Sequence, residues 1–169
     1  MKLRYSILIM MALFLSLATT SAIAKDKNPH PRPFSGSVIG QAEFPENGNC
    51  LDVTGAWWQT LSVAVGELTH MGRSEYFSSH CSTVDGSALA GGEATIVAAN
   101  GDELWIAYSG TTIAPPPIIT ISLENIVLGG TGRFEGATGF ITGYAFVTFL
   151  GLDAPSFPIE LTFNGYIIY

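Results

Sequence analysis

The chain after residue 33 alternates between apolar and polar residues with a period of two, which is typical of half-buried β-strands. In the last of these runs Ile159, Leu161 and Phe163 alternate with Glu160 and Thr162. Eight such runs, separated by glycine, proline, asparagine and aspartate, cover residues 34–44, 60–69, 73–82, 92–99, 102–112, 118–129, 138–150 and 158–168. Short connections between strands with one apolar face predict an all-β fold, with an antiparallel sheet closed into a barrel or folded into a sandwich.

Two connections carry clear turn signals. Asn100 and Gly101 stand between two apolar runs, and this dipeptide readily adopts the positive φ angles of a two-residue hairpin turn. Three consecutive prolines at 115–117 mark a second turn, because proline donates no amide to a sheet.

The stretch 129–143 holds six glycines around Arg133, and it raises the question of phosphate binding. A P-loop requires a lysine after its last glycine, but no lysine follows Lys27. The spacing that starts at Gly130 is one residue longer than a dinucleotide-binding fingerprint, and it lies between two strands rather than before a helix. The glycines therefore indicate a compact corner, with Arg133 paired to a carboxylate or to carbonyl groups and Phe134 packed beneath it.

The N-terminal segment predicts export. Residues 1–24 contain two basic residues, an apolar run and a final Ala-Ile-Ala, which is the composition of a Sec-type signal peptide cleaved after Ala24. The apolar run is shorter than the ~20 residues of a membrane-spanning helix. We therefore expect a secreted or periplasmic protein with an exposed leader at 25–33 and one β domain at 34–169.

Both cysteines, Cys50 and Cys81, lie after the predicted cleavage point. In an oxidising compartment such a pair favours a disulfide, which on the chain-entropy model stabilises the fold by about 3–4 kcal/mol. The alternative is two buried thiols. A thiol-redox role is disfavoured, because the pair lacks the Cys-x-x-Cys spacing.

Charge restricts the partners that we expect. Without residues 1–24, five basic residues remain against fourteen acidic ones, a formal net charge of −9. An acidic surface repels polyanions and anionic lipid, so the composition predicts no nucleic-acid binding. Outward faces that carry Ser, Thr, Gln and Glu disfavour an outer-membrane barrel, so no stable membrane insertion is expected either.

One motif resembles a known family. Residues 130–139, Gly-Thr-Gly-Arg-Phe-Glu-Gly-Ala-Thr-Gly, are similar to a corner motif of allene oxide cyclase-like barrels, a superfamily that includes the plant dirigent proteins. Residues 69–73 and 99–104 resemble segments of its secreted bacterial members. The resemblance covers residues 34–169 and implies an eight-stranded antiparallel β-barrel with an apolar cavity. Relatives with this barrel often form dimers or trimers, so a homo-oligomer stays open, but no catalytic residue of the cyclase maps onto a motif in this chain.

A second resemblance leaves an alternative barrel family open. Residues 55–58, Gly-Ala-Trp-Trp, are similar to the Gly-x-Trp motif of lipocalins, which are also eight-stranded barrels. The motif follows an earlier strand here instead of opening the barrel, and other lipocalin motifs are missing.

Polar residues in an apolar register are the candidates for catalysis, because a small barrel encloses packed side chains or one small ligand. Glu67 and Thr69 continue one apolar face, and Asn125 continues another. If these faces point inward, a carboxylate, a hydroxyl and an amide converge on an apolar chamber, where Glu67 and Asn125 are weak catalytic candidates. The alternative places all three near a barrel end, solvated or bonded to the backbone.

Candidates for ligand binding are the aromatic residues Trp105, Tyr108 and Tyr144, together with Thr69. The alternative is that the aromatic residues belong to the core or to a girdle of the barrel. His70 and His80 are too far apart along one strand, or around one turn, to share a metal ion, so we expect no metal site. No cofactor motif is present in the sequence.

These features predict an exported, soluble barrel that binds a small hydrophobic molecule in its cavity. One alternative is an isomerase or cyclase, without a cofactor, that folds a hydrophobic substrate and excludes water. The other is a structural or partner-binding module with no functional cavity. No motif in the sequence identifies a ligand or a substrate.

Overall fold

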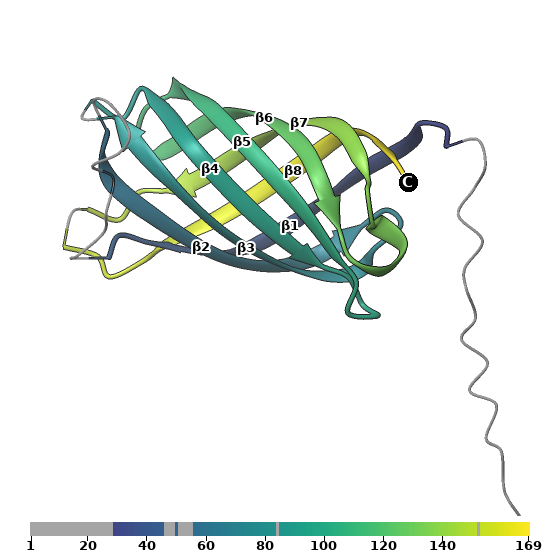
Figure 1. The fold of residues 1–169 in the computed structure, drawn as a ribbon. Coiled ribbons are helices and arrows are strands. Elements are labelled where there is room, and N and C mark those ends of the chain that lie inside the picture. Colours follow the sequence, from purple (N-terminus) through teal and green to yellow (C-terminus); the bar gives the residue numbers. More distant parts are fainter. Residues whose placement is uncertain (1–28, 46–49, 51–55, 84, 152) are drawn as a thin grey trace, which may run out of the picture.

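The eight alternating runs form eight strands that pair in chain order and close into an antiparallel barrel (Figure 1). The computed structural model describes residues 29–45, 50, 56–83, 85–151 and 153–169. The strands are β1 (Arg32–Glu43), β2 (Ala56–Leu68), β3 (Gly72–Thr83), β4 (Ala88–Val97), β5 (Glu103–Ala114), β6 (Ile118–Gly130), β7 (Thr138–Thr148) and β8 (Phe157–Ile168). Strand β8 pairs with β1 and leaves no open edge in the barrel. The eight-stranded barrel predicted from the sequence is confirmed.

The N-terminal boundary differs slightly from the predicted leader at 25–33. Strand β1 begins at Arg32, which is in register with Ile167 of β8. The Arg32 guanidinium lies 4.7 Å from the centroid of the Tyr169 ring, so a cation–π contact accompanies the strand pairing. The predicted signal peptide, residues 1–24, lies outside the described residues.

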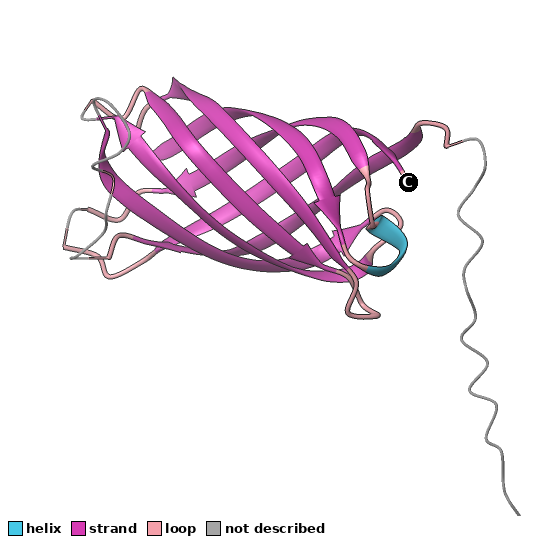
Figure 2. Ribbon diagram, viewed as in Figure 1, coloured by secondary structure: helices cyan, strands magenta, loops and turns pink. Residues whose placement is uncertain are grey.

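One end of the barrel is filled by side chains. The β2–β3, β4–β5 and β6–β7 turns lie at this end, together with the short 3-10 helix η1 (Gly132–Phe134) and the C-terminus (Figures 1 and 2). Phe134 packs edge-on against Tyr169, with ring centroids 5.1 Å apart. Other large side chains buried at this end include Phe34, Met71, Leu104 and Ile167. Dense packing of this kind closes the barrel at the end that bears the glycine-rich corner.

The glycine-rich stretch connects β6 to β7 as a corner. Arg133 Nε lies 3.2 Å from Asp102 Oδ2, and Arg133 Nη2 donates a 2.8 Å hydrogen bond to Asn100 Oδ1. A hydrogen bond from Asn100, followed by those from Arg133, holds the pKa of the Asp102 carboxyl below its ordinary value. The predicted corner is confirmed, with Arg133 paired to a carboxylate and Phe134 fully buried beneath it.

The β4–β5 turn is a hairpin, as predicted, but it is one residue longer than expected. Ala98 N donates to Asp102 O over 2.8 Å, which leaves three residues in the turn. Gly101 has a φ of 86°, whereas Asn100 does not adopt a positive φ. The Asn100 side chain instead donates to Asp102 Oδ2 over 2.8 Å. A three-residue turn with glycine in the left-handed region therefore replaces the predicted two-residue turn.

Strand β2 turns the opposite face inward from the one that its hydrophobicity suggests. Leu61, Val63 and Val65 are 39%, 54% and 44% exposed, so they lie on the outer wall. Thr60 and Ser62 are buried inside the barrel. The condition that the face of Glu67 and Thr69 points inward, which an interior site with these residues requires, is therefore not met.

The orientation of β2 follows from its neighbours. Cross-strand partners point to the same side of a sheet, so the strands on either side fix which face is inward. Val63 is in register with Gln41 of β1 and with Phe77 of β3, and both of these are exposed. Ser62 is in register with the buried Ala42. The alternation of the whole barrel therefore outweighs the preference of one strand.

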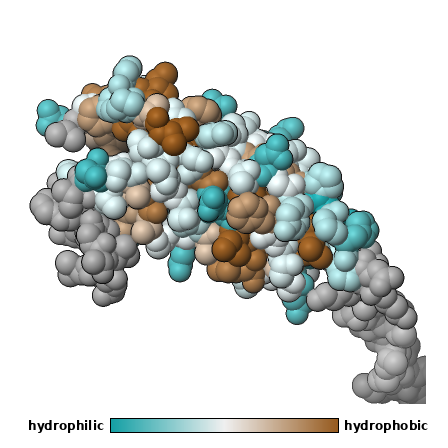
Figure 3. Space-filling view, turned by 90° about the horizontal axis from the view of Figure 1, so that it is seen from above, coloured by the Kyte–Doolittle hydropathy of each residue, from teal (hydrophilic) through white to brown (hydrophobic). Residues whose placement is uncertain are grey.

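The outer wall also carries apolar side chains on other strands. Phe77, Trp105 and Leu128 are each more than a third exposed. Seen from one side, apolar patches are separated by polar residues (Figure 3). Within the part of the chain that the structure describes, no helix is long and apolar enough to cross a membrane.

Candidate functional site

An interior cavity of about 140 Å³ lies in the half of the barrel opposite the filled end. Its walls include Ala42, Ser82, Thr112 and Val147, which stand near the last residues of β1, β3, β5 and β7. The filled end lies where the same four strands begin. An engineered apolar cavity of roughly 150 Å³ holds one benzene molecule, so this cavity has room for a molecule with a single ring.

The cavity has two chemically different sides. Strands β2 and β3, with β5, supply a polar wall made by Thr60, Ser62, Tyr76, Ser78, His80 and Tyr108. Strands β6, β7 and β8 supply an apolar wall made by Ile121, Leu123, Ala145, Ile159 and Leu161. In the closed order of eight strands, β2 and β3 lie opposite β6 and β7, so the two walls face each other. None of the described residues that line the cavity is Asp, Glu, Lys or Arg.

His80 and Tyr108 form the centre of the polar wall. His80 Nδ1 lies 2.8 Å from the Tyr108 hydroxyl, and the two rings meet edge-on with centroids 5.8 Å apart. Burial lowers the pKa of His80 to about 4, because the charged imidazolium loses its hydration inside the barrel. The imidazole is therefore uncharged at neutral pH.

The two tyrosines of the polar wall are also uncharged at neutral pH. Burial raises the pKa of Tyr76 to about 12, an effect that hydrogen bonds with Ser78 and Tyr108 partly oppose. Burial, followed by the nearby Tyr76, raises the pKa of Tyr108 well above its ordinary value. The polar wall consequently presents hydroxyl and imidazole dipoles rather than ionised groups.

Thr60 of the polar wall has a fully buried hydroxyl without a hydrogen-bond partner among the described residues. Its side chain is only 5% exposed. Thr60 is in register with His80 on the neighbouring strand. An unpaired buried hydroxyl costs about 1–3 kcal/mol, and rotation of the Thr60 side chain toward the cavity would let a hydrogen-bonding molecule pair with it.

The predicted ligand-binding residues divide between the two sides of the barrel wall. Tyr108 lines the cavity and is 7% exposed. Trp105 and Tyr144 lie on the outer wall, where they are 41% and 47% exposed. Trp105 Nε1 donates to Glu103 Oε2 over 2.9 Å, which satisfies its indole at the surface. Trp105 and Tyr144 are therefore not part of the interior site.

Glu67, Thr69 and Asn125 do not converge. Glu67 is exposed on the outer wall. Thr69 is exposed at the filled end, where its Oγ1 accepts a 2.8 Å hydrogen bond from Ser35 N. Asn125 is 2% exposed in the core and donates to Ile141 O over 2.9 Å. The condition for an interior carboxylate–hydroxyl–amide site is not met, because β2 turns its other face inward.

Sequence reasoning missed most of the polar wall. Tyr76, Ser78 and His80 recur at every second residue of one strand, which places them on one face. This face is in register with the small polar face of β2, through pairs such as Thr60 with His80. Polar residues on the matching faces of two adjacent strands could have predicted a cavity with a polar wall.

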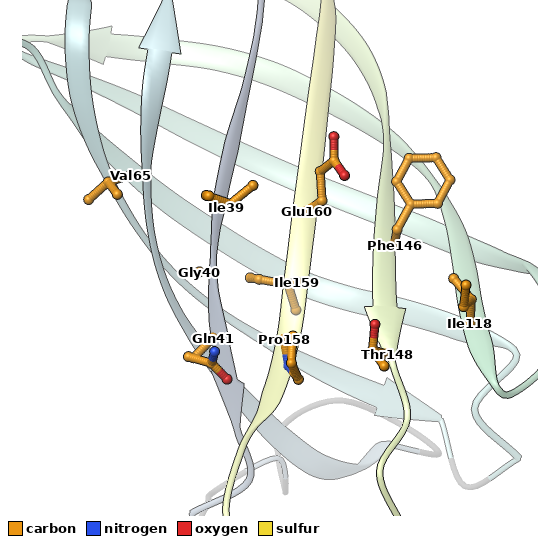
Figure 4. Close-up of a pocket in the computed structure, with 10 residues that line it drawn as sticks. All are labelled: Ile39, Gly40, Gln41, Val65, Ile118, Phe146, Thr148, Pro158, Ile159 and Glu160. Carbon is orange, nitrogen blue, oxygen red and sulfur yellow. The ribbon is translucent and has the colours of Figure 1, made fainter.

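A second, open groove lies on the outer wall and has a volume of about 800 Å³. Figure 4 shows Ile39, Glu160 and Phe146 side by side on β1, β8 and β7, and these residues are paired in register. The Glu160 carboxylate stands between the two apolar side chains of this row. A charge inserted in an apolar row on a β-surface opposes further strand-to-strand association, and the groove offers no enclosed space. The interior cavity is therefore the candidate site.

The disulfide predicted from the sequence is present. Cys50 and Cys81 are joined with a Cα–Cα distance of 5.7 Å and a sequence separation of 31 residues. Cys81 belongs to β3, one residue after His80. Across the described ranges, no group of three or more His, Cys, Asp or Glu side chains is arranged to hold a metal ion.

Comparison with known proteins finds distant similarity to solved structures. No family model matches the sequence, and no curated protein matches it. Among solved structures, the pterocarpan synthase dirigent protein GePTS1 is 13% identical over 85% of this chain and 88% of its own, with a TM-score of 0.45. The pterocarpan synthase dirigent protein PsPTS1 is 13% identical over 85% of this chain and 96% of its own, with a TM-score of 0.47.

Proposed function

We propose that this barrel is an exported protein that binds one small, mostly apolar molecule in its interior cavity. The observation that carries the proposal is the 140 Å³ space between the polar and apolar walls. Protein interiors are otherwise packed as densely as organic crystals, and a space of this size with one apolar wall favours a ligand that fits it. Export agrees with the disulfide between Cys50 and Cys81, since such bonds persist in oxidising compartments.

The alternative of an isomerase or cyclase has one supporting observation, the His80–Tyr108 pair. A general base works best with a pKa near the ambient pH, and a general acid has the same requirement. Burial displaces the pKa of His80 downwards to about 4 and that of Tyr108 upwards. Both shifts weaken proton transfer at neutral pH and leave hydrogen bonding intact, so they favour binding over acid–base catalysis.

Native mass spectrometry of the protein purified from its own secretion route tests the proposal. We expect an additional mass that is released when the protein unfolds. Saturation-transfer NMR with methylcyclohexane as the probe gives a second measurement that does not depend on the natural ligand. We expect signal transfer to the probe, because its ring fits the cavity.

Two variants separate cavity binding from surface adsorption. Ala145→Leu places a larger side chain in the apolar wall, and we expect it to abolish binding of both the natural ligand and methylcyclohexane. Ala107 lies on β5 and outside the cavity lining, so Ala107→Leu is the matched control that keeps binding. Absence of both the released mass and the methylcyclohexane signal contradicts the proposal and favours a structural module without a functional cavity.

A further inference from the structure

We propose that the cavity selects an uncharged molecule of one-ring size that carries a single oxygen function, a hydroxyl or a carbonyl, bound against the polar wall. This inference rests on the proposed function and specifies the ligand class. It follows from the arrangement of the two walls, from the unpaired Thr60 hydroxyl and from the absence of ionised side chains in the described lining.

The division of the cavity sets the orientation of the ligand. A purely apolar molecule would leave the hydroxyls of the polar wall facing hydrocarbon, which costs free energy for each group left unpaired. A ligand with one polar edge places that edge on β2 and β3 and its hydrocarbon on Ile121 and Leu161. Only such a ligand matches both walls at once.

The hydrogen bonds within the polar wall indicate which of its groups is open to a ligand oxygen. His80 and Tyr108 are bonded to each other, and the Thr112 hydroxyl donates to Gly86 O over 2.6 Å. Among the fully buried side-chain polar atoms of the described lining, Thr60 Oγ1 is the one without a hydrogen-bond partner. Rotation about the Cα–Cβ bond of Thr60 can move this hydroxyl to another staggered rotamer. In such a rotamer it can form a hydrogen bond with a ligand oxygen.

Charged ligands are excluded by the same wall. An ion that enters a cavity lined by neutral groups loses its hydration without gaining a counter-ion. The nearest titratable partners, His80, Tyr76 and Tyr108, all stay neutral at neutral pH, so none of them offers that counter-ion. Amines and carboxylates of the same size as the ligand should therefore bind far more weakly.

A panel of five molecules with one ring size tests the inference on the full mature chain at pH 7. The panel contains methylcyclohexane, cyclohexanol, cyclohexanone, cyclohexylammonium and cyclohexanecarboxylate, and dissociation constants are measured by NMR titration. We expect cyclohexanol and cyclohexanone to bind roughly threefold to tenfold more tightly than methylcyclohexane, the gain from one neutral hydrogen bond. We expect the two ions to bind at least about a hundredfold more weakly than cyclohexanol.

Two variants of the polar wall test which residues form a hydrogen bond with the ligand oxygen. Thr60→Val keeps the shape of the side chain and removes the unpaired hydroxyl, so we expect the preference for cyclohexanol over methylcyclohexane to fall to about one. Thr120 stands on the outer wall of β6, and Thr120→Val is the matched control that keeps the preference. Tyr108→Phe, with the exposed Tyr144→Phe as its control, repeats the test at the other side of the polar wall and should lower the preference in part.

The outcomes separate this inference from the function on which it rests. Equal binding of methylcyclohexane and cyclohexanol overturns the inference and leaves cavity binding standing. A preference for cyclohexanol that is unchanged in both Thr60→Val and Tyr108→Phe also overturns it, because the ligand oxygen is then bound by other residues. Binding of none of the five molecules, together with the absence of a released mass, overturns the proposed function itself.

Discussion

The Nδ1 atom of His80 lies 2.8 Å from the hydroxyl of Tyr108, although these residues belong to β3 and β5 and strand β4 lies between them. Tyr108 reaches across because its partner on β4 is Gly92. A Cβ built on Gly92 would stand 2.6 Å from the carbonyl oxygen of Tyr108 and 2.7 Å from two carbons of its ring. The pairing of β4 with β5 is also irregular between Leu89 and Gly92. A bulge of this kind changes the direction of neighbouring side chains, and here it lies beside Tyr108. A glycine on the middle strand thus permits the central hydrogen bond of the polar wall.

Gly92→Ala should therefore displace the Tyr108 ring. We expect the substitution to lower the free energy of unfolding by about 1–3 kcal/mol, the usual cost of an extra methyl group in a packed interior. Urea denaturation followed by circular dichroism measures this change. A double-mutant cycle with Tyr108→Ala is the control, since Gly92→Ala should cost less once the ring is gone. Equal costs in both backgrounds would show that the ring is not what the added methyl group meets.

The low pKa of His80 predicts a loss of stability in mild acid. Its folded value is about 4, whereas an unfolded histidine titrates near 6.5, so the unfolded chain binds the proton first. The contribution of His80 to stability is complete above pH 6.5 and falls as the pH drops from 6.5 to 4. The integrated loss is on the order of 3 kcal/mol.

The measurement is the midpoint of urea unfolding at several pH values for the protein and for His80→Gln. Glutamine keeps a hydrogen bond to Tyr108 but does not titrate, so the variant should lose less stability between pH 6.5 and 4. His70→Gln is the control, because His70 is exposed and contacts Pro33 O at the filled end. If the protein and His80→Gln lose stability in parallel across this window, His80 is not the responsible group.

Thr60→Val should stabilise the empty protein. Valine fills the same space without a hydroxyl, and the Thr60 hydroxyl has no partner among the described residues. Removal of an unpaired buried hydroxyl is worth roughly 1 kcal/mol, so the thermal midpoint should rise by several degrees. Differential scanning calorimetry of ligand-free protein, with Thr120→Val alongside, provides the comparison. A lower midpoint for Thr60→Val would mean that ordered water satisfies this hydroxyl in the empty cavity.

The sequence predicted the barrel far better than the site, and β2 shows why. Alternation locates a strand but does not say which face is inward, and on β2 the larger apolar residues Leu61 and Val63 face outward. A cavity requires small or polar residues on its wall, so a strand that lines it departs from the rule that apolar residues face the core. For this reason the alternation did not identify Thr60 and His80 as cavity-lining residues. The role of Arg133 was predictable because its glycine-rich corner is formed by residues close together in the sequence.

Removal of the disulfide gives a prediction that concerns the whole fold. Cys50 and Cys81 have a sequence separation of 31 residues, and on the chain-entropy model a closed loop of about this length stabilises the folded state by about 3–4 kcal/mol. We expect the double variant Cys50→Ala, Cys81→Ala to lose about this amount of unfolding free energy, measured by urea denaturation. Because Cys81 is adjacent to His80, binding of cyclohexanol to the folded double variant reports separately on the cavity. A loss well below 1 kcal/mol would mean that the unfolded chain is already restricted near this loop, and the entropic account of the bond would then be wrong.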